Sequence, residues 1–117
     1  MYTKRYHIII DVSSIQNKIL TGTKELEKFL KILPKVIGMS VLSGPVIAQG
    51  IEENPGISGF VIIDYSHISI HTFSKYREAL VDIFSCKKYK KSDAVKAVLK
   101  FFQVPKSQAN VQEVSWG

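Results

Sequence analysis

Hydroxyl, imidazole and thiol side chains lie close together in one part of the sequence. Residues 66–72 read Ser-His-Ile-Ser-Ile-His-Thr, and Cys86, the only cysteine of the chain, follows shortly after them. Proteins use these three groups for nucleophilic attack and for proton transfer. We therefore expect Ser66, His67, His71 and Cys86 to lie near one another in a region rich in strands and to be able to carry chemistry.

Three other interpretations of these residues are open. His67 and His71 have the spacing of metal ligands on a helix, but on a strand they would lie ~13 Å apart, too far for one zinc ion. A cysteine–histidine hydrolase would need an orienting group and an oxyanion loop, and the sequence provides neither. A single cysteine is by default a small buried apolar residue. The residue types alone favour this last interpretation of Cys86.

The composition is that of one globular domain spanning residues 1–117. The chain is 45% hydrophobic and 22% charged, and it is long enough to bury one core. No apolar run approaches the ~20 residues of a membrane span, and the N-terminus lacks the organisation of a signal peptide. One cysteine cannot form an internal disulfide, so we expect a cytoplasmic protein with no membrane partner.

The formal net charge is +6, which could indicate an anionic partner such as nucleic acid. The densest basic segment surrounds Tyr89 and consists of Lys87, Lys88, Lys90 and Lys91. It has no glycine-rich or RNP-like context, so we interpret it as a solvated turn rich in lysine. Nucleic acid is not an expected partner.

Apolar periodicity predicts two helices. Thr23 is placed to cap the first, Pro34 lies at its end, and its apolar face consists of Leu26, Phe29, Leu30 and Leu33. Ser92 is placed to cap the second, Pro105 follows its end, and its apolar face consists of Val95, Val98, Leu99 and Phe102.

Apolar and β-branched runs predict strands separated by turns. The strands are expected at 6–12, 36–42, 45–51, 57–63, 68–73 and 111–114, with a further short apolar run at 80–84. Residues 52–56, Glu-Glu-Asn-Pro-Gly, are typical of a turn. This order predicts an α+β fold in which two helices cover one face of an antiparallel sheet. The other face would then need a cover, so we expect self-association into a dimer.

The segment from Gly56 to Cys86 resembles the processing region of the prokaryotic S-adenosylmethionine decarboxylases. The family pattern is Val-Ser-Gly, then Glu-Ser-His-x-x-x-His-Thr-Trp-Pro-Glu, then Asp-x-Phe-x-Cys-Gly. At the same spacing this chain has Ser58-Gly59, Ser66-His67, His71-Thr72, Asp82, Phe84 and Cys86. The order of the predicted elements is similar to the family over nearly the whole chain, from His7 to the last strand.

The resemblance implies a proenzyme that cleaves itself between Tyr65 and Ser66 into fragments 1–65 and 66–117. The Ser66 hydroxyl would attack the carbonyl of Tyr65 and form an ester, and His71 would then remove the Cα proton of residue 66. Ser58 would hydrogen-bond the tetrahedral intermediate of the first step. Residue 66 would become a pyruvoyl group, and no metal is implied.

The resemblance also implies a decarboxylase of spermidine and polyamine biosynthesis. The pyruvoyl carbonyl would form a Schiff base with the amine of the substrate and accept the electrons left when carbon dioxide departs. Cys86, as the protonated thiol, would return a proton to Cα. The implied substrate is S-adenosylmethionine, and the implied assembly is a homodimer of cleaved protomers that share active-site residues.

The sequence departs from the family pattern where substrate should bind. The family's Trp-Pro-Glu is Phe73-Ser74-Lys75, which loses the carboxylate expected to hold the ribose hydroxyls, and the aromatic residue expected to stack on adenine aligns with Glu52. We expect Glu52, Glu53 and Phe73 to contact substrate. An acidic pair would suit a cationic side chain, and some relatives act on arginine or ornithine, so a basic amino acid is an alternative substrate. A solvated acidic loop would explain Glu52 and Glu53 equally well.

Two further departures are Tyr65, which replaces the family's Glu before the serine, and Lys87, which replaces its Gly after the cysteine. Cleavage uses only the carbonyl of residue 65, so the replacement of Glu by Tyr65 need not impair processing. A non-catalytic paralogue that regulates an active partner is a further alternative. The presence of Ser66, His71 and Cys86 argues against it.

Overall fold

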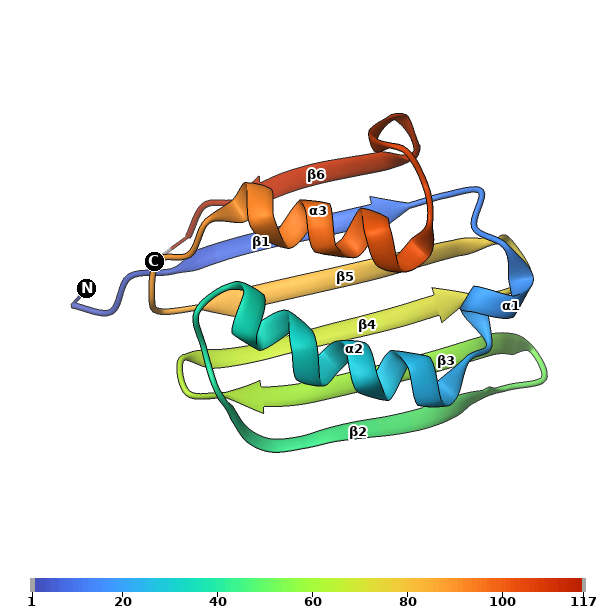
Figure 1. Ribbon diagram of the computed structural model, residues 1–117, viewed down its shortest axis with the longest axis horizontal. Helices are drawn as coiled ribbons and strands as arrows, with labels where there is room; N and C mark the ends of the chain where they lie inside the picture. The colour runs from blue at the N-terminus through green and yellow to red at the C-terminus, as the bar shows by residue number, and fades with distance from the viewer. Residues whose placement is uncertain (1, 117) are drawn as a thin grey trace.

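The computed structural model describes residues 2–116, and its strands form one six-stranded antiparallel sheet (Figure 1). The strand order is β2-β3-β4-β5-β1-β6, and every neighbouring pair is antiparallel. In chain order the elements are β1 (Tyr6–Val12), α1 (Asn17–Leu20), α2 (Thr23–Val36), β2 (Val41–Ile51), β3 (Asn54–Ile63), β4 (Ser66–Phe73), β5 (Glu78–Ser85), α3 (Lys91–Phe102), the 3₁₀ turn η1 (Lys106–Gln108) and β6 (Ala109–Val114).

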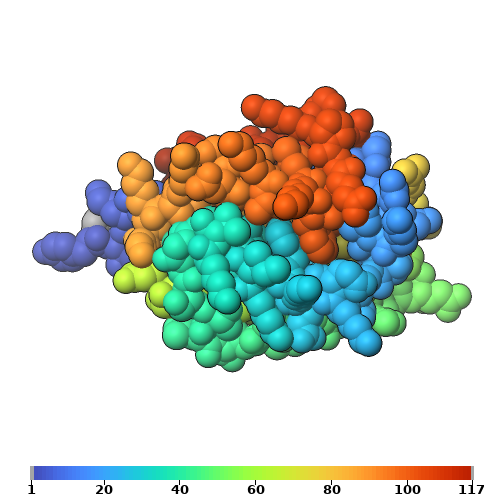
Figure 2. Space-filling model, viewed as in Figure 1, coloured from blue at the N-terminus to red at the C-terminus, as the bar shows by residue number. Residues whose placement is uncertain are grey.

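The two long helices, α2 and α3, lie side by side on the same face of the sheet and cover most of it (Figures 1 and 2). The predicted α+β fold with an antiparallel sheet and two covering helices is therefore confirmed, and the short helix α1 is an addition to it. None of the helices between residues 2 and 116 is long and apolar enough to span a bilayer.

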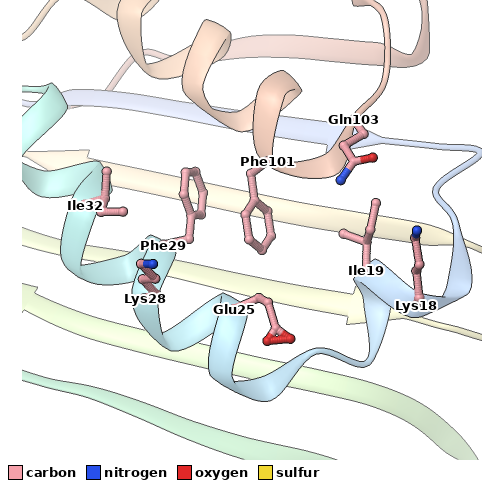
Figure 3. A pocket seen from close by; sticks show the side chains of 8 residues that line it. All are labelled: Lys18, Ile19, Glu25, Lys28, Phe29, Ile32, Phe101 and Gln103. Atoms are coloured by element: carbon pink, nitrogen blue, oxygen red, sulfur yellow. The ribbon is translucent and has the colours of Figure 1, made fainter.

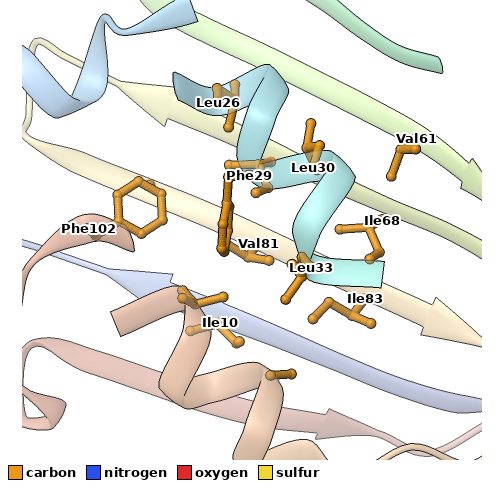
Figure 4. Close-up of a cluster of buried hydrophobic side chains, with 14 of the residues drawn as sticks. Ile10, Leu26, Phe29, Leu30, Leu33, Val61, Ile68, Val81, Ile83 and Phe102 are labelled. Atoms are coloured by element: carbon orange, nitrogen blue, oxygen red, sulfur yellow. The ribbon is translucent and has the colours of Figure 1, made fainter. Parts of the chain in front are cut away.

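The core lies between this face of the sheet and the two helices (Figure 4). Alternate strand residues point toward the helices, which explains why every second residue of β1, β4 and β5 is buried. Side chains with no exposed surface here include Ile10, Leu26, Leu30, Leu33, Ile68, Val81, Ile83 and Phe102. Removing each from water contributes ~1.5–3 kcal/mol to folding. A side chain at Gly59 would collide with Leu30, so glycine lets α2 approach β3 closely.

The helix ends differ from the prediction. Gly22 precedes α2 and Lys90 precedes α3, and neither helix has a side-chain cap, so Thr23 and Ser92 do not act as caps. Both residues lie inside the first turn. Gly38 lies two residues after the last residue of α2, Val36, and its φ of +76° allows the amide of Met39 to donate to the carbonyl of Pro34 at 2.8 Å.

The prediction of two separate strands at 36–42 and 45–51 is wrong. Val36 is the last residue of α2, and a single strand, β2, runs from Val41 to Ile51 with irregular register near Ser43. The predicted turn at 52–56 is shorter in the structure, because Asn54 already pairs with Ile51 at the start of β3. A continuous irregular strand and two adjacent strands have the same apolar pattern, which is why the sequence did not separate them.

Tyr89 does not belong to the solvated lysine-rich turn in which we placed it. The residue is only 7% exposed, and its hydroxyl donates to the carbonyls of Ile83 at 3.1 Å and Tyr6 at 3.3 Å. Burial, and secondarily the charge of Asp82, raise the pKa of the Tyr89 hydroxyl far above its ordinary value. The ring therefore anchors the segment after β5 to the core, while the neighbouring lysines stay at the surface.

The Tyr89→Phe substitution should lower the free energy of unfolding by about 0.5–1.5 kcal/mol at neutral pH, because the carbonyls of Ile83 and Tyr6 lose the hydroxyl that donates to them. Above pH ~10 the unfolded chain loses the tyrosine proton first, so the stability contributed by Tyr89 must fall as pH rises. Urea unfolding of both proteins near pH 8 and above pH ~10 measures the difference. We expect the difference in free energy of unfolding between the two proteins to be smaller at the higher pH. A difference that does not change with pH would contradict this account of Tyr89.

The face of the sheet opposite α2 and α3 carries the residues that alternate with the core. Ser58, His67 and His71 lie on this open face, as their register and the burial of the intervening residues require. Several apolar side chains here are well exposed to solvent, among them Val46, Phe60, Ile62 and Trp116. The face without helices is therefore the one that holds these three predicted site residues.

Candidate active site

The predicted cleavage site lies in the tight turn between β3 and β4, at one end of the sheet. Ile63 pairs with Ser66, so Asp64 and Tyr65 form a two-residue hairpin loop. Ser66 has a φ of +137°, a value that residues with a side chain rarely adopt. Such a conformation costs ~1–3 kcal/mol and persists only where the surroundings impose it. The residue in this conformation directly follows the peptide bond that the predicted cleavage would break.

Hydrogen bonds hold this turn from the side of β2. The amide of Asp64 donates to the carbonyl of Ser40 at 2.9 Å, and the amide of Ser40 donates to Asp64 Oδ1 at 3.0 Å. This reciprocal pair restrains the residue before Tyr65 and so helps to fix the turn that carries the predicted cleavage site.

The carbonyl oxygen of Tyr65 accepts a hydrogen bond from the backbone amide of Cys86 at 2.9 Å. The buried Ser85 fixes the backbone around that amide, because its hydroxyl accepts from the Lys87 amide and donates to the Lys87 carbonyl, both at 2.9 Å. An amide aimed at this oxygen would also stabilise negative charge that develops on it. The sequence motifs did not reveal this donor, because it depends on the register between β4 and β5.

Ser58 and His71 form a pair across β3 and β4. Ser58 Oγ lies 2.7 Å from His71 Nδ1, and the two residues are direct cross-strand partners. When Nδ1–H donates to Ser58, Nε2 is left unprotonated and can accept a proton. The neighbouring Thr72 faces the core, where its hydroxyl accepts from the Ile57 amide at 2.9 Å and donates to the Leu20 carbonyl at 2.7 Å. These bonds fix the strand that carries His71.

The structure divides the predicted catalytic residues into two groups. Tyr65, Ser66 and Cys86 meet at one end of β4. His71, with its partner Ser58, lies five residues farther along the same strand, which is ~16 Å from Ser66. Ser66 and His71 are therefore not neighbours within one chain, because a strand extends by ~3.3 Å at each residue.

Aromatic rings form a row across the open face. The His67 ring lies 5.2 Å from Phe60 and 5.5 Å from Phe84, and the ring of Trp116 stacks on Phe84 at 5.2 Å. His67 thus packs among aromatic side chains. The row gives the open face an apolar centre between the two groups of predicted catalytic residues.

Asp82, one of the residues that match the family pattern, binds His7. Its Oδ1 lies 2.9 Å from His7 Nε2, and Trp116 Nε1 lies 3.2 Å from His7 Nδ1. The indole can only donate, so Nδ1 accepts and the His7 proton sits on Nε2, toward Asp82. The two contacts orient the imidazole within the aromatic row.

The three predicted substrate contacts lie at the opposite end of the sheet from Tyr65, but they do not meet within one chain. Glu52 lines a cavity of about 310 Å³ together with Ser74, near the turn between β2 and β3. Phe73 lines a separate cavity of about 440 Å³, and Glu53 is exposed in the turn. Glu52 therefore shares a cavity with Ser74, which belongs to the segment that replaces the family's Trp-Pro-Glu.

A cavity of about 510 Å³ lies among α1, α2 and α3, on the far side of the sheet from Ser58 and His71 (Figure 3). Its lining contains no hydroxyl, thiol or imidazole group and consists of Lys18, Ile19, Glu25, Lys28, Phe29, Ile32, Phe101 and Gln103. These side chains include none of the serine, histidine and cysteine residues predicted for the reaction, so this cavity is not the candidate active site.

The chain belongs to the S-adenosylmethionine decarboxylase family, whose sequence model matches residues 6–115. The fold agrees with this assignment. The crystal structure of the adenosylmethionine decarboxylase from Aquifex aeolicus superposes with a TM-score of 0.82, at 24% identity, over 100% of this chain and 93% of that chain. At this identity the likeness is one of fold.

Two relatives called S-adenosylmethionine decarboxylase proenzyme are similar over much of the sequence. The protein from Thermodesulfovibrio yellowstonii is 38% identical over 88 residues, which span 74% of this chain and 62% of the relative, less than two thirds of it. The protein from Clostridium botulinum strain Loch Maree is 32% identical over 114 residues, which span 96% of this chain and 93% of the relative.

Proposed function

We propose that this chain is the proenzyme of a pyruvoyl-dependent S-adenosylmethionine decarboxylase that cleaves itself between Tyr65 and Ser66. One observation carries the proposal. The carbonyl of Tyr65 accepts a hydrogen bond from the Cys86 amide, and the next residue, Ser66, is a hydroxyl-bearing residue in a strained conformation. Nucleophile, activated carbonyl and strain thus coincide at the bond that the family pattern marks for cleavage.

Processing would take two steps. The Ser66 oxygen attacks the Tyr65 carbonyl carbon, the C–N bond breaks, and an ester to Ser66 Oγ replaces the peptide while the amine of residue 66 is freed. A base then removes the Cα proton of residue 66, and the Cβ–Oγ bond breaks to release Tyr65 as a carboxylate. Water replaces the nitrogen of the resulting dehydroalanine, which yields a pyruvoyl group and ammonia. The amide of Cys86 would stabilise the oxyanion of the first step.

The separation of the two catalytic groups supports a shared active site. His71, the base of the second step, lies ~16 Å from Ser66 within one protomer. Both Ser58 and His71 lie on the open face, where exposed apolar residues such as Phe60 and Ile62 favour association. We infer a homodimer in which Ser58 and His71 of one protomer act on the Tyr65–Ser66 bond of its partner.

Mixing two inactive variants tests this arrangement. Ser66→Ala lacks the nucleophile and His71→Ala lacks the base, so neither protein alone should produce the two fragments. When the two are co-expressed, the His71→Ala chain should be cut, because its Ser66 would meet His71 of the other protomer. The two chains differ in mass, so mass spectrometry identifies which one is cleaved. An uncut His71→Ala chain in isolated mixed dimers would contradict a shared site.

In the processed enzyme, the residues around position 66 fit a pyruvoyl group. Such a group supplies a carbonyl that accepts the electrons released when an α-amino acid loses carbon dioxide. Cys86 lies beside residue 65 and is partly buried, and its thiol is the proton donor that we assign to Cα of the product. The carboxylate of Glu52 and the ring of Phe73 would contact the substrate from the partner's side.

Substrate choice is tested by assays of carbon dioxide release from S-adenosylmethionine, arginine and ornithine with the same sample. We expect S-adenosylmethionine to be the substrate, as the relatives' names suggest. A basic amino acid is a second candidate, because Glu52 places a carboxylate in the cavity beside Ser74 where an adenine-stacking ring was expected. Release from arginine or ornithine alone would reject S-adenosylmethionine in favour of this candidate.

A further inference from the structure

The two departures from the family pattern that flank the cleavage site contact each other. Tyr65 stands where the family has Glu, and Lys87 stands where it has Gly. In the structure Lys87 Nζ lies 5.1 Å from the centre of the Tyr65 ring, within the ~6 Å range of a cation–π contact. Tyr65 is 39% exposed, so Lys87 covers a ring that is otherwise open to solvent.

Lys87 is held in place at both of its ends. Its backbone amide and carbonyl bond to the hydroxyl of the buried Ser85, and its ammonium donates to the carbonyl of Gly38 at 3.3 Å. Gly38 follows the C-terminal end of α2, where unpaired carbonyls favour a positive charge. Figure 1 shows the end of α2, the turn between β3 and β4, and the segment after β5 at the same end of the sheet. Lys87 thus connects all three segments across Tyr65.

Cleavage would change the charge beside this lysine. Elimination converts the carbonyl of Tyr65 into an α-carboxylate, and one of its oxygens already accepts from the Cys86 amide at 2.9 Å. The neighbouring Asp64 carries a second negative charge, so the new C-terminus needs a cation. Released from Ser66, the carboxylate is free to turn toward the ammonium that covered its ring.

We propose that Lys87 is a positioning residue with two consecutive tasks. Before cleavage it holds Tyr65 so that the carbonyl stays on the Cys86 amide. After cleavage it pairs with the α-carboxylate of Tyr65 and retains the fragment 1–65 on the fragment 66–117. This inference rests on the proposed function, since it requires that the Tyr65–Ser66 bond is cut.

Lys87→Met tests both tasks, because it keeps most of the aliphatic stem and removes the charge. Lys88→Met is the matched control at the exposed neighbouring position. We expect Lys87→Met to slow self-cleavage by about two- to fivefold, the range set by an exposed cation–π contact, and Lys88→Met to cleave at the wild-type rate. Lys87→Arg retains the charge and the ring contact and should restore cleavage. Intact mass at timed intervals after synthesis measures the rate.

Retention of the fragment is measured by size exclusion of the cleaved proteins in increasing urea. The cleaved Lys87→Met protein should release 1–65 at a lower urea concentration than the cleaved wild type and Lys88→Met. In the uncut Ser66→Ala protein, Lys87→Met should lower the urea concentration of unfolding by a smaller amount, because no α-carboxylate is present. An equal shift in cut and uncut proteins would mean a merely structural contact and would overturn the second task.

The failure of this inference differs from the failure of the proposed function. If Lys87→Met and Lys88→Met match the wild type in cleavage rate and in fragment retention, Lys87 has neither task although the enzyme still processes itself. If the wild-type chain stays uncut, the proposed function and this inference are both wrong.

Discussion

The Ser66→Ala protein should remain a single uncut chain with no decarboxylase activity. Alanine removes the oxygen that attacks the Tyr65 carbonyl in the proposed mechanism, so no ester forms and no pyruvoyl group arises at position 66. The expected loss is complete, because both the cleavage and the later turnover depend on this one oxygen. Alanine keeps the β-carbon, so the backbone at position 66 stays under the same restriction as in the wild type.

Intact mass and a decarboxylation assay on the purified variant measure this effect. Ser69→Ala is the matched control, since Ser69 lies on the same strand, opposite Phe60 and Asp82, and has no role in the proposed chemistry. It should be processed like the wild type. Fragments 1–65 and 66–117 from the Ser66→Ala protein would show that another group performs the cleavage.

The Cys86→Ala protein should separate two roles that one residue combines. The backbone amide of Cys86 holds the Tyr65 carbonyl, and alanine keeps that amide, so the proenzyme should still cleave itself. The thiol is the proposed proton donor in turnover, and its removal should lower kcat by about 10²–10⁴-fold. The variant would thus be fully processed and nearly inactive.

Timed cleavage and steady-state assays on the same preparation separate the two effects. A Cys86→Ala enzyme with wild-type turnover would reject the thiol as the proton donor. Failure to cleave in a folded Cys86→Ala protein would instead mean that the thiol takes part in processing. Lys88→Met, two residues away and at the surface, controls for disturbance of this segment.

Much of the fold could be predicted because its apolar pattern is regular. The strand at 6–12 was predicted with its observed bounds, and the apolar face of α2 was correct, since burial imposes a period of two or of nearly four residues. The face predicted for α3 was correct only in part, because Val98 and Phe102 are buried but the unpredicted Ala94 completes the buried face, while Val95 and Leu99 are only partly buried. The irregular strand β2 was wrongly divided into two strands and the short helix α1 was missed, because neither has a distinctive period. The predicted helix caps were wrong for another reason, because side chains suited to capping also occur one or two residues inside a helix.

The candidate site could be predicted in its residue types but not in its geometry. The motifs identified Ser58, Ser66, His71 and Cys86, and the structure pairs Ser58 with His71. Sequence spacing could not show that this pair lies ~16 Å from Ser66, because that depends on strand extension. It also could not show the contribution of backbone atoms such as the Cys86 amide, or the contact between Lys87 and Tyr65, which arises from the pairing of β4 with β5.

The central claim is that the chain cuts itself between Tyr65 and Ser66, and the intact mass of the purified wild-type protein tests it most directly. The account predicts two species, one of residues 1–65 and one of residues 66–117, the second lighter than a serine-initiated fragment by the mass of ammonia. A single species with the mass of the whole chain, persisting through long incubation of the folded protein, would contradict it.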